Sequence, residues 1–193
     1  PEYTLSDADE LADVQVGWQT VVLGSTRVQL RTSTLEDKAV ACRMLTCLVR
    51  DLQGAIWEYV DQIAKLMVPL LTFYFFDDVR TAAADACPFL LMATADYFKR
   101  TNSSDGVEYL TGLFEYIITH LLQTIHAEPD LEVLCTFLEA LSNSIFALGD
   151  NCLDEKMMNN IATLLAILMD DLEKRRGIRN DARNDIDYDE EME

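Results

Sequence analysis

The side chains best suited to catalysis in this sequence are two histidines and five cysteines, and their spacing assembles no familiar reactive site. His120 and His126 are six residues apart, which places them on different sides of a helix, and neither lies at a metal-ligand spacing from a cysteine. The sequence also lacks the G-x-S-x-G, P-loop, H-E-x-x-H and G-x-G-x-x-G motifs. We therefore expect no enzyme, no metal site and no cofactor.

The cysteines form no C-x-x-C pair, and most of them fall within apolar helical patterns. This placement predicts reduced, mostly buried thiols of an intracellular protein. The five are Cys42, Cys47, Cys87, Cys135 and Cys152.

Carboxylates are the abundant chemical groups, with 34 Asp and Glu against 15 Lys and Arg in 193 residues, a net charge of −19. Because half of the residues are apolar, the chain can still bury a core. Binding to nucleic acid or to an anionic membrane needs a cationic surface, so we exclude both as partners and expect a basic partner instead. The longest apolar run, about 66–76, contains Pro69 and is too short to span a membrane.

The negative charge is concentrated in the middle of the chain, where residues 101–155 include ten acids and no Lys or Arg. At 100° per residue, acids gather on one side of each of two predicted helices. Such stripes could hold a Lys/Arg-rich segment, although a solvated face that only keeps the protein soluble explains them equally simply. The candidate contacts are Asp78, Asp85, Asp96, Glu132, Glu139 and Asn143.

The apolar period is helical almost without a break from residue 33 onward, which predicts an all-α fold. Short connections make consecutive helices antiparallel neighbours, as in a bundle or in a solenoid of helical hairpins. Lys38 and Arg80 lie 42 residues apart, and each is followed by small residues, a period that favours a HEAT or armadillo solenoid of about three hairpins. The helices are expected at about 34–53, 55–76, 78–99, 106–126, 129–149 and 154–175.

The two ends of the chain differ from this helical region, residues 33–175. Residues 1–32 form an acidic start followed by β-branched runs, and a short hairpin that pairs 17–23 with 27–32 is expected as an insertion. Residues 176–193 are acidic at their end and predict a flexible segment.

Several strings, in order, resemble the importin beta-3 branch of the karyopherin-beta nuclear transport receptors. The similarity is strongest from 36 to 91 and extends over nearly the whole chain. The strings are Lys38-Ala39-Val40-Ala41-Cys42-Arg43-Met44-Leu45, Glu58-Tyr59-Val60, Lys65-Leu66-Met67-Val68-Pro69-Leu70-Leu71, Asp78-Val79-Arg80, Glu128-Pro129-Asp130, Gly149-Asp150-Asn151-Cys152-Leu153 and Asp187-Tyr188-Asp189-Glu190.

The resemblance implies an internal slice of a longer HEAT superhelix that shuttles between cytoplasm and nucleus. Receptors of this family bind basic import signals of cargo, touch Phe-Gly nucleoporins and release cargo to the GTP form of Ran. In the family the second helix of each pair lines the concave face, which here implies the helices at about 35–53, 78–99 and 129–149. The acidic stripes would then lie where cargo or Ran is met.

Two other functions share parts of this pattern. A HEAT scaffold, such as a phosphatase regulatory subunit or a coat adaptor, shares the fold but does not need a 55-residue span without a cation. An acidic chaperone for basic proteins shares the charge, but such proteins usually concentrate their acids in a tail.

Overall fold

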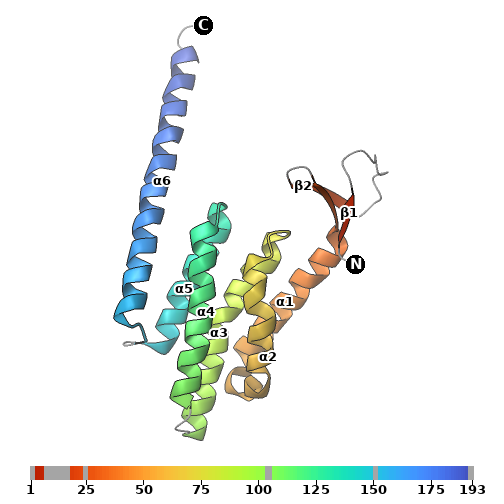
Figure 1. Ribbon diagram of the computed structural model, residues 1–193, viewed down its shortest axis with the longest axis vertical. Coiled ribbons are helices and arrows are strands. Elements are labelled where there is room, and N and C mark those ends of the chain that lie inside the picture. The colour runs from red at the N-terminus through yellow and green to blue at the C-terminus, as the bar shows by residue number, and fades with distance from the viewer. Residues whose placement is uncertain (1–2, 7–17, 24–25, 103–105, 150–151, 191–193) are drawn as a thin grey trace. The chain divides into compact units, whose positions relative to one another are not determined.

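The computed structural model describes residues 3–6, 18–23, 26–102, 106–149 and 152–190 (Figure 1). The chain divides into two compact units, Pro1–Gly149 and Asp150–Glu193. The first unit contains a small sheet and the helices α1 to α5, and the second contains α6. Each unit is described by itself below.

Three short strands form an antiparallel sheet in the order β1-β3-β2. Strand β2 (Trp18–Leu23) pairs with β3 (Thr26–Arg31) from Trp18 opposite Arg31 to Leu23 opposite Thr26. Strand β1 (Tyr3–Ser6) pairs with the other edge of β3, and the sequence analysis did not foresee this third strand. Most of the acidic start predicted within residues 1–32 lies outside the described residues.

Helix α1 (Thr32–Leu52) follows β3 directly, and the helix predicted at 55–76 is divided into three segments. These are the 3₁₀ turn η1 (Gln53–Ile56), α2 (Trp57–Met67) and the 3₁₀ turn η2 (Val68–Thr72). The α-helix ends at Met67 because Pro69 lacks the backbone N–H that the next helical turn would require. The remaining helices of this unit are α3 (Asp77–Thr101), α4 (Gly106–Ala127) and α5 (Leu131–Leu148).

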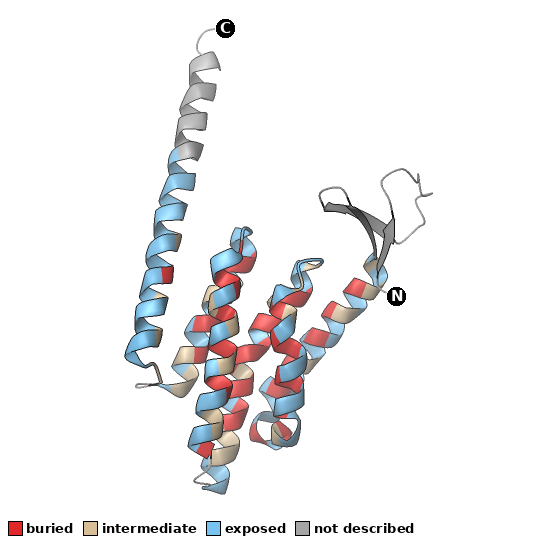
Figure 2. Cartoon of the chain, in the orientation of Figure 1, coloured by how far each residue is buried: buried red, intermediate tan, exposed pale blue. Residues whose placement is uncertain are grey.

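Helix α3 is the centre of this unit, because it contacts α1, α2, α4 and α5. Helices α1, α3 and α5 form one row with α3 in the middle. Helices α2 and α4 form a second layer that packs against this row. Buried residues accordingly line the facing sides of these helices (Figure 2). Five buried alanines allow the close approach of α3 to its neighbours: Ala82, Ala83, Ala84, Ala86 and Ala93.

Helix α5 is also apolar enough, with a mean hydropathy of 1.5 over 18 residues, to match a membrane span by length and composition. The sequence analysis expected no such segment. In the structure Val133, Phe137 and Leu141 are buried, and α5 packs against α3 and α4 while Glu132 and Glu139 are exposed. One helix of this kind is weak evidence for a span.

Helix α6 (Glu155–Glu190) continues well past the predicted end at 175, so the expectation of a flexible segment from 176 is corrected for 176–190. The stretch after Arg176 contains no proline, and Gly177 alone costs about 1 kcal/mol of helix stability. Two i,i+4 ion pairs precede it, Asp170–Lys174 at 2.6 Å and Asp171–Arg175 at 2.8 Å. Residues 191–193 lie outside the described residues.

Candidate functional site

The candidate residues on α3 lie on the narrow stripe that its neighbours leave exposed. Asp78 and Asp85 are exposed, Met92 between Asp85 and Asp96 is 46% exposed, and Asp96 is half-buried. We call this stripe, together with the exposed stripe of α5 described below, the acidic face. The three candidate acids on α3 differ in what surrounds each carboxyl group.

Asp78 is held by a cation of the neighbouring helix. Arg43 Nη1 of α1 donates to Asp78 Oδ2 at 3.0 Å, and both side chains are about half exposed. The bond crosses from α1 to α3, so it ties two helices of one row together. An exposed pair of this kind is worth at most about 1 kcal/mol, so a ligand can compete with it.

Asp85 has a carboxylate as its neighbour instead of a cation. Burial of its carboxyl group and, second, the negative charge of Glu139 on α5 raise the pKa of Asp85. The residue as a whole is exposed, so the carboxyl remains accessible while protein flanks it. Among the residues that the structure describes, no ion pair neutralises Asp85 or Glu139. The packing of α3 against α5 thus places two predicted acids, 54 positions apart in sequence, on neighbouring helices.

The carboxylate of Asp96 is already bonded within the protein. Its carboxylate accepts a hydrogen bond from the backbone N–H of Gly54 at 2.9 Å, and it also pairs with Arg100 at 2.9 Å. Gly54 lies so close to α3 that an added Cβ would be 2.6 Å from Asp96 Oδ2. Asp96 therefore fastens the α1–α2 turn to α3, and the structure does not group it with Asp85 and Glu139.

The stripe on α5 carries the other predicted residues, with Glu132, Glu139 and Asn143 all exposed. Asp130 caps this helix by accepting from the backbone N–H groups of Glu132 at 2.8 Å and Val133 at 3.1 Å. Phe146, one turn beyond Asn143, is 87% exposed. Carboxylates, an amide and an aromatic ring thus share one side of α5, with Asp85 adjacent on α3.

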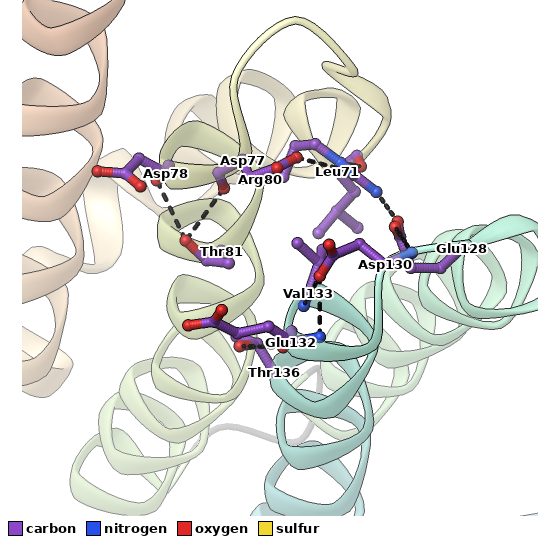
Figure 3. A network of polar contacts seen from close by, with 10 residues as sticks. All are labelled: Leu71, Asp77, Asp78, Arg80, Thr81, Glu128, Asp130, Glu132, Val133 and Thr136. Carbon is purple, nitrogen blue, oxygen red and sulfur yellow. Dashed lines mark hydrogen bonds and ion pairs between the residues drawn. The ribbon is translucent and has the colours of Figure 1, made fainter. Parts of the chain in front are cut away.

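A buried ion pair between Arg80 and Glu128 was not foreseen (Figure 3). The side chain of Arg80 is 4% exposed and that of Glu128 is fully buried, and the two are in direct contact. Arg80 also donates to the carbonyl of Leu71 at 3.3 Å and pairs with Asp77 at 2.9 Å. Arg80 therefore joins η2, the start of α3 and the α4–α5 connection.

Two aromatic rings complete the surroundings of Arg80. Its guanidinium carbon lies 4.9 Å from the centre of the Tyr74 ring and 5.4 Å from that of Phe137. The signal in the sequence was a cation on the alanine-rich face of a helix, where only a paired charge is tolerated. The partner could not be identified from sequence, because Glu128 lies 48 positions away and precedes a proline.

A groove of about 430 Å³ lies between α2 and α4, on the other side of the unit from the α1–α3–α5 row. Asp61 and Lys65 pair at 2.6 Å along it, and Gly112 contributes no side chain. An added Cβ at Gly112 would meet nothing within 4 Å. The lining residues are Asp61, Ala64, Lys65, Tyr109, Gly112, Leu113 and Tyr116.

Helical hairpins stacked side by side in this way define a HEAT-repeat protein, and comparison with known proteins supports that class. Residues 133–193 match the family described as importin repeat 6. The chain is 27% identical over 195 residues to importin subunit beta-3 of Saccharomyces cerevisiae. The aligned region covers 97% of this chain and 17% of that protein.

Solved structures agree with the sequence matches. Kap121p bound to the extreme C-terminus of the protein phosphatase Cdc14p gives a TM-score of 0.79 at 25% identity, over 90% of this chain and 17% of that one. Kap121p bound to RanGTP gives a TM-score of 0.69 at 26% identity, over 83% of this chain and 15% of that one.

The predicted resemblance to the importin beta-3 branch of the karyopherin-beta receptors is confirmed. The predicted solenoid fold is confirmed by the same neighbours. The chain spans about a sixth of the length of the curated relative, so the activity of a whole receptor belongs to the proposal below.

Proposed function

We propose that this chain is part of a nuclear import receptor and that its acidic face contacts basic import signals of cargo. The observation that carries the proposal is that α3 packs against α5 and presents exposed Asp85 and Glu139, neither of which has an ion pair among the described residues. Like charges on neighbouring helices repel each other, and a bound ammonium or guanidinium group reduces that repulsion. The proposed contacts are Asp85, Glu132, Glu139 and Asn143, with Asp78 held in part by Arg43.

The remaining groups on α5 suit the same ligand. Asn143 can accept a hydrogen bond from a cationic side chain and donate one to a peptide carbonyl. The exposed ring of Phe146 can pack on the aliphatic stem of a lysine or face a guanidinium. An acidic face without an exposed aromatic ring would be a poorer match for long cationic side chains.

The wider role follows from the relatives. We infer that the full-length receptor shuttles between cytoplasm and nucleus, that it releases cargo to Ran in its GTP form, and that it is not an enzyme. A structural neighbour bound to RanGTP supports the second inference. The proposal assigns binding, and no chemical reaction, to the described residues.

The groove between α2 and α4 supports a second partner, the Phe-Gly repeats of nucleoporins. Its Tyr109 and Tyr116 side chains and its volume of about 430 Å³ suit one phenylalanine ring with its neighbouring backbone. Gly112→Leu would fill this groove from a position where a Cβ meets no atom. We expect that variant to lose binding to a Phe-Gly peptide while its unfolding midpoint stays close to that of the wild type.

Calorimetry with a Lys/Arg-rich import-signal peptide tests the main proposal. The expected result is saturable binding that weakens as salt is raised from low to physiological concentration and that falls in the Glu132→Gln/Glu139→Gln variant. A peptide with the same composition in scrambled order is the ligand control. Asp170→Asn/Asp171→Asn on α6 is the protein control, because it removes the same number of negative charges from residues that are not among the proposed contacts.

The alternative functions give different results in the same experiment. An acidic chaperone would bind the import signal and its scrambled form equally, with the same loss in both double variants. A HEAT scaffold of another kind would bind neither peptide at physiological salt. Either outcome would remove the import-receptor proposal for this part of the chain.

A further inference from the structure

Helix α6 presents an apolar stripe to solvent. Met158, Leu165, Met169 and Leu172 are each 39% to 61% exposed, although large apolar side chains are usually buried. Together with exposed Ala162 they follow one another at intervals of four and three residues, which is the spacing of a coiled-coil seam. The second unit contains no other helix or strand among its described residues, so this stripe, which we call the α6 seam, has no partner within the unit.

The two ends of the α6 seam carry opposite charges. Asp154 and Glu155 lie at its N-terminal end, and Arg175 and Arg176 lie at its C-terminal end. Asp154 is held there as the N-cap, because its side chain accepts from the backbone N–H of Met157 at 2.6 Å. A parallel pair of identical helices would place Glu155 beside Glu155 and Arg176 beside Arg176, whereas an antiparallel pair places acids beside bases. The seam therefore complements itself in the antiparallel orientation alone.

We propose that the α6 seam pairs with the α6 seam of a second copy of this chain, in antiparallel orientation. In the alignment that best matches the two seams, Met158 lies opposite Met169 of the second copy. Ala162 then lies opposite Leu165 of the second copy, so that a small side chain faces a large one. The inference goes beyond the proposed function, because it involves none of the residues assigned there to peptide binding.

The same alignment brings the charged ends together. Asp154 lies beside Arg175 of the second copy, and the two-fold symmetry repeats this pair at the other end of the contact. Arg175 also pairs with Asp171 of its own helix at 2.8 Å, and both of these side chains are about half exposed. Because an exposed pair of this kind contributes little free energy, it can rearrange when the second helix binds.

Analytical ultracentrifugation of the complete chain over a range of concentrations tests the pairing. The wild type is expected to change from the monomer mass of 21.9 kDa to twice that mass as concentration rises. Leu165→Glu should raise the dissociation constant of the dimer by more than about tenfold, because each dimer then loses two buried leucines. Ile167→Glu is the matched control, since Ile167 is also exposed but lies on the opposite side of α6. Circular dichroism should show equal helix content in the two variants.

Disulfide cross-linking distinguishes the two orientations. Under mild oxidation, a mixture of Met158→Cys and Met169→Cys chains should form a link between positions 158 and 169, which peptide mass spectrometry would detect. A link between two copies of Met158→Cys would show a parallel pair and overturn the inference. Equal effects of Leu165→Glu and Ile167→Glu would overturn it too, and so would a chain that stays monomeric at every concentration, as expected if a different helix covers the seam. None of these outcomes bears on the binding of basic peptides.

Discussion

Replacement of Glu128 by Gln removes one partner of the buried Arg80 ion pair and should destabilise the fold strongly. Glu128 is fully buried and Arg80 is 4% exposed, so the guanidinium would be left with an uncompensated charge away from water. Loss of one partner of a buried pair costs about 3–5 kcal/mol. Because Asp77 still pairs with Arg80 at 2.9 Å, we expect a loss near the lower end, about 3 kcal/mol.

The assay is urea unfolding followed by helical circular dichroism, with Asp61→Asn as the control. Asp61 pairs with Lys65 and both side chains are exposed, so its replacement should change the free energy of unfolding far less. A paired variant, Arg80→Met/Glu128→Gln, should recover much of the loss, since it removes the buried charge altogether. Equal losses in Glu128→Gln and Asp61→Asn, or no recovery in the paired variant, would refute this reasoning.

Three further predictions concern Gly54, the carboxyl group of Asp85 and the thiol of Cys87. Gly54→Ala should lower the unfolding midpoint, because its Cβ would lie 2.6 Å from Asp96 Oδ2, and an unchanged midpoint would contradict that contact. The raised pKa of Asp85 means that its ionisation at neutral pH opposes folding, so Asp85→Asn should increase the free energy of unfolding at pH 7. This gain should shrink as the pH falls toward the ordinary pKa of an aspartate, because the wild-type carboxyl group then becomes protonated. Unfolding measured at several pH values tests both expectations. Burial raises the pKa of Cys87 to about 12, so a thiol reagent should modify exposed Cys135 in the native protein and reach Cys87 only on unfolding, as peptide mass spectrometry would detect.

The helical repeat could be predicted because its causes are local. The 3.6-residue apolar period marks the helices, and the small residues after Lys38 and Arg80 mark the row in which helices approach closely. The α-helix α2 ends at Met67, earlier than predicted, because of Pro69, whereas α6 continues through Gly177 beyond its predicted end; apolar periodicity does not determine such helix ends.

The pairings across helices could not be predicted, because they depend on rotation and register between segments far apart in the chain. Helical angles placed Asp85 and Glu139 on stripes, but only the packing of α3 against α5 brings them together. The same packing assigns Asp96 to the Gly54 turn and Arg43 to Asp78. Composition alone would count all of these acids as equivalent.

The measurement that tests the central claim most directly is to locate a bound basic peptide by NMR chemical-shift mapping on the isotope-labelled chain. The account predicts saturable shifts centred on the backbone amides around Asp85 and Glu139, continuing along α5 toward Phe146, and their loss in Glu139→Gln. Shifts spread over acidic residues throughout the chain, or centred on α6, would contradict a defined binding face on α3 and α5.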